Sequence, residues 1–247
     1  MRYFLEIAYD GTRFHGWQVQ PNALSVQEVL DDCLSKVLRQ PVSSTGSGRT
    51  DTGVHASQQF AHFDVAQPLD AQQVVYRLNR ILPTDIAAIS LYEVPDDAHA
   101  RFDAHARTYH YHITFAKNPF RRYHAYYHSR PLDIKQMNMA AALLLQHEDF
   151  TTFSKVKGDT THYRCHIYEA IWRKQGEELV FTIRANRFLR GMVRLLVGTL
   201  VDVGRGKLTV QQFGQIITSQ DRRKSSGAAP AEGLSLAKVE YPEGLLA

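Results

Sequence analysis

Apolar positions in the first hundred residues alternate in some segments and recur at helical spacing in others. Helical spacing follows Ser25, which forms a capping box with Glu28, and it follows Asp70 until Pro83 ends the pattern. Strand-like segments cover residues 3–9, Gly46 to Val65 with a turn inside it, and residues 86–94. The predicted order is β-α-β-β-α-β, which is typical of a ferredoxin-like domain with an antiparallel sheet and helices on one face.

The rest of the chain repeats this order with insertions. Strands are predicted at 107–115, 164–174, 178–185 and 234–241, and helices at 133–145, at 187–202 and from Thr209. The helix at 187–202 is apolar nearly all round, which favours burial, yet Arg187, Arg190 and Arg194 would share one face. We therefore predict two α+β halves, residues 1–100 and 101–247, joined edge to edge with an active-site cleft between them.

Composition places this chain among globular proteins. It has 247 residues, of which 44% are hydrophobic, and no apolar run approaches the length of a membrane span. The N-terminus lacks a signal-peptide profile, so we expect a cytoplasmic protein. Cys33 and Cys165 belong to no Cys-x-x-Cys pair, which argues against a disulfide framework. His162, Cys165 and His166 lie close together but lack a fourth ligand, so we expect no metal.

Charge is divided unevenly along the chain. Residues 1–100 hold 7 Lys and Arg against 12 Asp and Glu, whereas residues 101–247 hold 22 against 13. From Arg101 to Tyr127 aromatic and basic residues are interleaved, a mixture that suits RNA, whose unpaired bases stack while its phosphates attract cations. Alternating aromatics also build ordinary strands, and we prefer that interpretation for Tyr111 and Phe115.

The segment from Gly46 to Ala56 contains the cluster most suggestive of chemistry. Two glycines precede Arg49, Asp51 stands between two threonines, and Gly53 follows. Glycine allows positive φ and close approach of a ligand to the backbone, so a carboxylate held there can be rigid and accessible. Taken alone, the segment is more typical of a hairpin in which Asp51 caps its own turn, because Asp-x-Gly is common turn chemistry.

Several motifs resemble those of one known family. Gly48 to Ala56 resembles, over nine consecutive positions, the catalytic signature of the tRNA pseudouridine synthase A (TruA) family. The family's other motifs are matched, in its order, by Tyr9 to Gln27, Arg107 to Tyr111, Glu148 to Thr151, Ala185 to Arg194, and Ala229 to Pro242. Thr52 and the segment from Lys155 to Cys165 depart from the family pattern. The resemblance therefore covers essentially the whole chain.

The resemblance implies an α+β fold of two ferredoxin-like halves joined in one extended antiparallel sheet, and a homodimer. It implies a tRNA substrate, in which uridine at about positions 38, 39 and 40 of the anticodon stem-loop is reached by opening the base. The reaction isomerises uridine to pseudouridine without redox change or net hydrolysis, so it needs no cofactor. No membrane partner is implied.

The resemblance also assigns roles to four residues. Asp51 is the implied catalytic residue, which either attacks C1′ or the base covalently, or removes a sugar proton so that a glycal forms. Arg194 is the candidate that keeps this carboxylate ionised, and Arg49 grips phosphate or wedges under the displaced base. Tyr109 is expected to lie against the flipped uracil and to help remove the C5 proton.

Two other functions fit parts of the sequence. Asp51-Thr52-Gly53 is also the Asp-Thr-Gly of aspartic proteases, but one copy is present where two are needed, and long amphipathic helices argue against that architecture. A non-catalytic RNA-binding protein would account for the charge and the aromatic residues alone.

Overall fold

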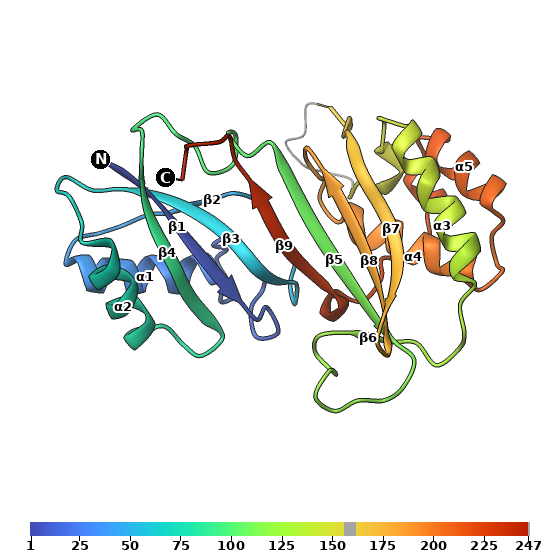
Figure 1. Cartoon of the computed structure of the whole chain (residues 1–247), viewed down its shortest axis with the longest axis horizontal. Coiled ribbons are helices and arrows are strands. Elements are labelled where there is room, and N and C mark those ends of the chain that lie inside the picture. The colour runs from blue at the N-terminus through green and yellow to red at the C-terminus, as the bar shows by residue number, and fades with distance from the viewer. Residues whose placement is uncertain (156–161, 247) are drawn as a thin grey trace. The chain divides into compact units, whose positions relative to one another are not determined.

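The structure, a computed structural model, describes residues 1–155 and 162–246 (Figure 1). The chain divides into two compact units. Unit 1 comprises Met1–Ala106 together with the C-terminal segment from Ser235, and unit 2 comprises Arg107–Leu234. The predicted boundary after residue 100 left the C-terminal segment in the second half, whereas here it clusters with unit 1. The cause is backbone pairing, because the last strand joins a strand near the beginning of the chain.

Unit 1 has the predicted order of elements. They are β1 (Arg2–Tyr9), α1 (Val26–Leu38), β2 (Thr45–Gly46), β3 (His55–Asp64), α2 (Ala71–Ile81), β4 (Ile86–Val94) and β9 (Leu234–Glu240). The strand order is β4-β1-β3-β9, with β2 added to β3. β1 runs antiparallel to both β3 and β4. β9 runs parallel to β3, so the sheet is mixed and the expectation of a purely antiparallel sheet is corrected at this pair.

Both helices of unit 1 begin at the predicted caps. The Ser25 hydroxyl accepts a hydrogen bond from the Glu28 N–H, and the Asp70 carboxylate accepts one from the Gln73 N–H. The helices pack against each other, and α2 also packs against β4 (Figure 1). Leu34 and Leu78, one on each helix, have no exposed surface. The amphipathic pattern therefore predicted these helices correctly.

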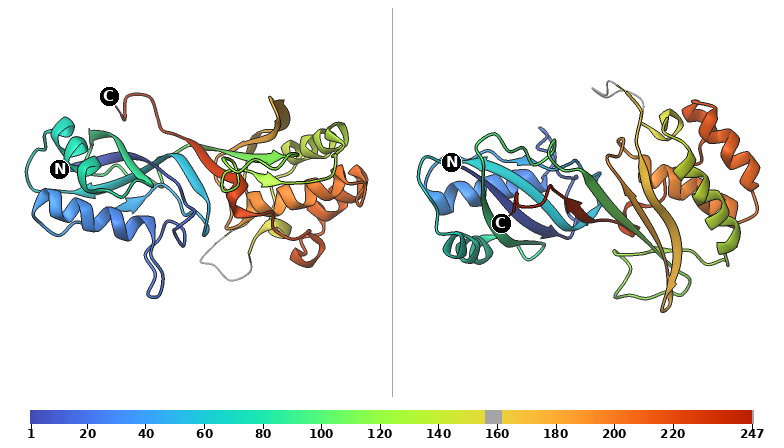
Figure 2. Two further views of the ribbon diagram at one scale, coloured as in Figure 1. Left: turned by 90° about the horizontal axis from the view of Figure 1, so that it is seen from below. Right: turned by 45° about the horizontal axis from the view of Figure 1, so that its top comes forward.

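In the residues that the structure describes, unit 2 combines a small sheet with three helices. Its elements are β5 (Ala106–Thr114), β6 (Tyr126–Tyr127), α3 (Ile134–Leu143), β7 (Ile167–Gln175), β8 (Glu178–Ala185), α4 (Met192–Gly204) and α5 (Val210–Thr218), with short 3-10 turns between some of them. β8 lies between β5 and β7, antiparallel to both, and β6 pairs in parallel with β5. The three helices pack against one another, as Figure 2 shows, and α3 also packs against β7. The α+β class is confirmed.

The long apolar helix starts later than its sequence pattern predicts. α4 begins at Met192, because Gly191 takes a left-handed conformation with a φ of 72°. Arg187 and Arg190 therefore precede the helix, and the predicted stripe of three arginines on one helical face is wrong: only Arg194 lies on α4. The predicted burial is confirmed, since most positions of α4, on every side of the helix, are inaccessible to solvent.

The division into units sharpens the charge asymmetry. Unit 1 holds 9 Lys and Arg against 15 Asp and Glu, whereas unit 2 holds 20 against 10. Unit 2 is therefore the part of the chain suited to a polyanion. No helix in the described ranges has the length and apolar character needed to cross a bilayer.

Candidate active site

Asp51 occupies the first position of a tight turn that precedes β3. Its carbonyl oxygen accepts a hydrogen bond of 3.1 Å from the Val54 N–H, and Gly53, the third residue of the turn, has a φ of 75°. Positive φ at this position favours glycine, which explains the Asp-Thr-Gly-Val sequence. Asp51 itself is half-buried. The local sequence therefore fixes the backbone from which the carboxylate projects.

The loop that follows β1 holds this turn from one side. The Phe14 carbonyl accepts a hydrogen bond from the Gly53 N–H at 3.2 Å, and the Thr50 carbonyl accepts one from the Trp17 N–H at 3.3 Å. The Tyr9 hydroxyl lies 2.9 Å from the buried Thr50 hydroxyl. The residues before and after Asp51 are thus attached to the N-terminal loop, which restrains the backbone that carries the carboxylate.

Two glycines let the loop approach the turn this closely. A Cβ built on Gly11 would lie 2.6 Å from the Val54 carbonyl carbon and nearer still to its oxygen. Gly16 has a φ of 88°, and a Cβ there would collide with the Thr50 carbonyl oxygen. The sequence marked this loop as too aromatic for a plain connector but did not reveal its packing on Asp51. The sequence feature that could have indicated this packing is the presence of two glycines in an aromatic loop.

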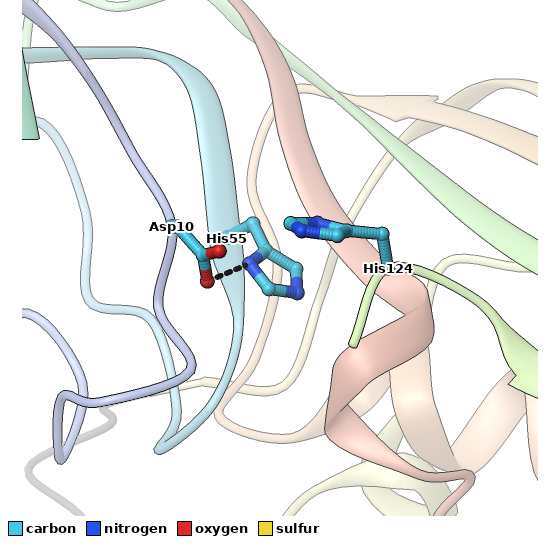
Figure 3. Close-up of side chains that lie close together, drawn as sticks. All are labelled: Asp10, His55 and His124. Atoms are coloured by element: carbon cyan, nitrogen blue, oxygen red, sulfur yellow. Dashed lines mark ion pairs between the residues drawn. The ribbon is translucent and has the colours of Figure 1, made fainter. Parts of the chain in front are cut away.

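A carboxylate–imidazole pair anchors the same loop. Asp10 follows β1 and His55 opens β3, and Figure 3 shows their side chains facing each other, with 3.1 Å between the carboxylate Oδ1 and the ring Nδ1. The Gly11 N–H lies 3.0 Å from the same ring nitrogen, and the Asp10 carboxylate also accepts a hydrogen bond from the Thr12 N–H at 2.9 Å. His55 is buried. Sequence reasoning assigned no role to this pair.

A buried amide holds the other side of the catalytic segment. Gln59, on β3, has no exposed surface; its Nε2 donates to the Gly48 carbonyl at 2.9 Å and its Oε1 accepts from the Ser47 hydroxyl. A Cβ on Gly46 would lie 2.7 Å from Cζ2 of the Trp17 ring and nearer still to its Nε1 and Cε2. The backbone just before Arg49 is therefore immobilised, while the Arg49 side chain is exposed to solvent.

Tyr109 lies on β5, in unit 2. It pairs with Ile183 of β8, and its half-buried ring meets the Phe188 ring edge to face, with 5.1 Å between centroids and a 90° interplanar angle. Tyr111, two residues on, is fully buried, and its hydroxyl donates to the Pro230 carbonyl at 2.9 Å. Burial raises the pKa of Tyr111 well above its ordinary value, so this phenol is not suited to proton transfer.

Arg194 is the third residue of α4 and is held by the segment before β9. Its Nε donates to the Ala229 carbonyl at 2.7 Å, and its own carbonyl accepts from the Ala229 N–H at 2.8 Å. These two hydrogen bonds orient the guanidinium plane. They also give the Ala229-Pro230-Ala231 motif a structural role. Asp51 and Arg49 thus share one restrained segment of unit 1, and Tyr109 and Arg194 both belong to unit 2.

Two of the three potential metal ligands that lie close together in the sequence, His162 and Cys165, have other surroundings in the structure. His162 Nε2 lies 3.0 Å from an Arg187 guanidinium nitrogen. Cys165 is buried, and that burial raises the pKa of its thiol to about 12. Residues 156–161 of the segment that departs from the family pattern lie outside the described residues.

Comparison with known proteins gives one consistent result. A family model described as tRNA pseudouridine synthase matches residues 7–103 and 140–242. The tRNA pseudouridine synthase A of Bacteroides thetaiotaomicron is 53% identical over 247 residues, covering 99% of this chain and 92% of the relative. That of Bacteroides fragilis is 51% identical over 244 residues, covering 98% and 97%. That of Exiguobacterium sibiricum is 39% identical over 242 residues, covering 98% and 97%.

Proposed function

Because the chain belongs to the tRNA pseudouridine synthase family, whose members are isomerases, we propose that it converts uridine to pseudouridine in the anticodon stem-loop of tRNA, with Asp51 as the catalytic carboxylate. The observation that carries the proposal is the restraint on Asp51. Its half-buried side chain projects from a turn that the N-terminal loop fastens at Thr50 and Gly53. A carboxylate positioned before the substrate arrives loses little entropy in reaching the transition state.

The reaction needs one such carboxylate. The bond between N1 of uracil and C1′ breaks, the base turns, and C5 joins C1′; C5 then loses its proton and N1 gains one, so the composition of the nucleotide is unchanged. Asp51 serves this exchange either as a nucleophile toward C1′ or the base, or as the base that removes the C2′ proton. A substrate deuterated at C2′ distinguishes these routes, because only removal of that proton gives a primary isotope effect on the rate.

Isosteric replacement of Asp51 tests the catalytic assignment. Asp51→Asn retains the size of the side chain and the backbone hydrogen bond from Val54, so the turn should stay intact while the carboxylate is lost. We expect pseudouridine formation on an anticodon stem-loop transcript to fall to background and tRNA binding to stay within about threefold, below 1 kcal/mol. Retained turnover in the variant would remove Asp51 from the mechanism.

The roles proposed for the other residues rest on their settings. The ring of Tyr109, held edge to face by Phe188, would lie against the uracil; Tyr109→Phe should cost rate much more than affinity. Arg194, oriented through its Nε, would act as the counter-ion of the Asp51 carboxylate. Arg194→Lys should not replace it, because an ammonium group lacks the planar set of N–H donors of a guanidinium. The exposed Arg49 would contact RNA phosphate or the displaced base.

The target positions follow from mapping pseudouridines in total tRNA with and without the protein. We expect the change to be confined to about positions 38, 39 and 40, where stacked or paired bases must be opened before reaction. Changes at other positions would contradict the proposed target while leaving the reaction intact. The homodimer and the cytoplasmic location stay predictions, and sedimentation analysis tests the first.

A further inference from the structure

The loop between β5 and β6, residues 115–125, places an aromatic ring in solvent. Phe120 is 91% exposed, more than any other large hydrophobic side chain in the described part of the chain. An apolar ring kept in water gives up the stabilisation that burial would supply. A ring exposed to this extent is therefore a candidate for contact with another molecule.

Hydrogen-bonded turns restrain the backbone that carries this ring. The Asn118 side-chain oxygen accepts a hydrogen bond from the Phe120 N–H at 3.0 Å, and the Asn118 carbonyl accepts one from the Arg121 N–H at 3.0 Å. The Arg121 carbonyl in turn accepts one from the His124 N–H at 2.9 Å. The loop consists of successive hydrogen-bonded turns, so its backbone has less conformational entropy to lose on binding than an unrestrained loop would have.

An ion pair fixes the loop to the sheet. The Arg121 guanidinium donates from Nε and Nη2 to the two carboxylate oxygens of Glu178, on β8, at 2.6 and 2.9 Å, and His112 Nδ1 lies 2.8 Å from the same carboxylate. Burial raises the pKa of Glu178, but these hydrogen bonds outweigh it and the pKa is lowered overall. The ion pair of Arg121 thus anchors the loop to the sheet, and Phe120 is the residue next to this anchor in the chain.

The surroundings of the ring are cationic. Lys117 and Arg122 are exposed, and the Arg122 guanidinium carbon lies 4.1 Å from the centroid of the Tyr123 ring. No Asp or Glu occurs between Asp103 and Asp133. The loop therefore combines an exposed ring with two exposed cationic side chains, a pairing that fits nucleic acid better than an apolar protein surface.

We propose that residues 115–125 form a second RNA-contacting element, in which Phe120 stacks on an unpaired base of the tRNA other than the reacting uridine while Lys117 and Arg122 contact phosphates. The inference rests on the proposed function, because that function makes tRNA the bound polyanion. An unpaired base is required, since bases within a helix already have both faces covered by their neighbours. The net positive charge of unit 2 favours the same partner.

Three substitutions at one position separate stacking from simple apolar contact. Phe120→Ala should raise the Kd for unmodified tRNA by about 5- to 150-fold, because stacking of a base on an aromatic ring contributes that much to binding. Phe120→Trp should bind as tightly as the wild type, whereas Phe120→Leu, which is apolar but has no ring, should not. At saturating tRNA the kcat of Phe120→Ala should stay within about twofold of wild type.

The salt dependence of binding gives an independent readout. Phe120 carries no charge, so Phe120→Ala should leave the slope of log Kd against log salt unchanged, whereas Arg122→Ala should reduce it by about 0.7 to 0.9. Leu145→Ala is the matched control, because Leu145 is an exposed apolar side chain of the same unit, at 46%, without a ring. It should bind tRNA as the wild type does.

Three results would overturn the inference. One is wild-type affinity in Phe120→Ala, and another is full rescue by Phe120→Leu, which would indicate simple apolar contact in place of stacking. The third is a changed oligomeric state of Phe120→Ala in sedimentation, which would assign the ring to a second copy of the chain. Failure of the proposed function is distinguishable, because then the wild-type protein itself forms no pseudouridine, whatever Phe120 contributes to binding.

Discussion

Gly11→Ala would test whether the N-terminal loop holds the Asp51 turn in place. The added methyl would lie 2.6 Å from the carbonyl carbon of Val54 and nearer to its oxygen. Carbon and oxygen atoms of separate groups approach to about 3.3 Å, so the two backbones would have to separate by roughly 1 Å. Both atoms belong to backbone, and neither can rotate away as the end of a flexible side chain can.

The cost can be worked out from the contacts at this point. Overpacking of a tight interior costs about 1–3 kcal/mol. Separation would also lengthen the 3.0 Å contact between the Gly11 N–H and His55 Nδ1, a bond of about 1 kcal/mol. A total of about 2–4 kcal/mol corresponds to a decrease in Tm of roughly 4–16 °C for a chain of this size. Displacement of Asp51 by 1 Å should slow the chemical step by about 100-fold.

Thermal unfolding and single-turnover pseudouridine formation measure the two effects. Gly48→Ala is the control, because a Cβ there meets no atom within 4 Å and the residue lies in the same segment. Its Tm should change by less than about 2 °C, which corresponds to under 1 kcal/mol. A Gly11→Ala protein with wild-type Tm and wild-type rate would refute the argument that close packing of this loop positions Asp51.

Further predictions concern stability and reactivity. Gln59→Leu should destabilise the protein by about 2 kcal/mol in urea unfolding, because the Ser47 hydroxyl and the Gly48 carbonyl lose their buried partner; an unchanged midpoint would contradict this. Burial lowers the pKa of His62 from 6.5 to about 4, so the neutral ring is favoured in the folded state. The resulting stability, up to about 3 kcal/mol, is fully present above pH 6.5 and is lost as pH falls toward 4. His62→Asn should flatten that part of the pH profile of urea midpoints, and a wild-type profile already flat there would disprove it. Cys165, buried and with a raised pKa, should react with a thiol reagent at pH 8 only after unfolding; rapid labelling of the folded protein would disagree.

Elements with local signals were predicted well. Ser25 and Asp70 each place a side-chain acceptor at the first free N–H groups of a helix, and an amphipathic pattern follows each of them. These signals depend on residues three or four positions apart, so they can be read from the chain directly. The order of the elements in unit 1 followed from them.

The start of α4 shows where such signals fail. Phe188 and Leu189 continue the apolar pattern of the helix toward its N-terminus, but Gly191 adopts a positive φ and the helix begins after it. Glycine permits both helical and left-handed conformations, and packing decides between them. Because the helix was predicted to start too early, three arginines were also predicted on one helical face. Only Arg194 of these three lies on the helix.

The turn at Asp51 and, through the resemblance of nine consecutive residues, the family could be read from the amino-acid sequence. Its tight turn needs positive φ at Gly53, a requirement met within four residues. The folded structure was needed to explain why Gly11, Gly16 and Gly46 are glycines, and to show that β9 returns to pair with β3 at His55. These contacts join segments separated by up to 180 residues in sequence, as between His55 and Ser235. Their stability depends on burial and hydrogen bonding summed over the folded unit, which no local pattern of residues records.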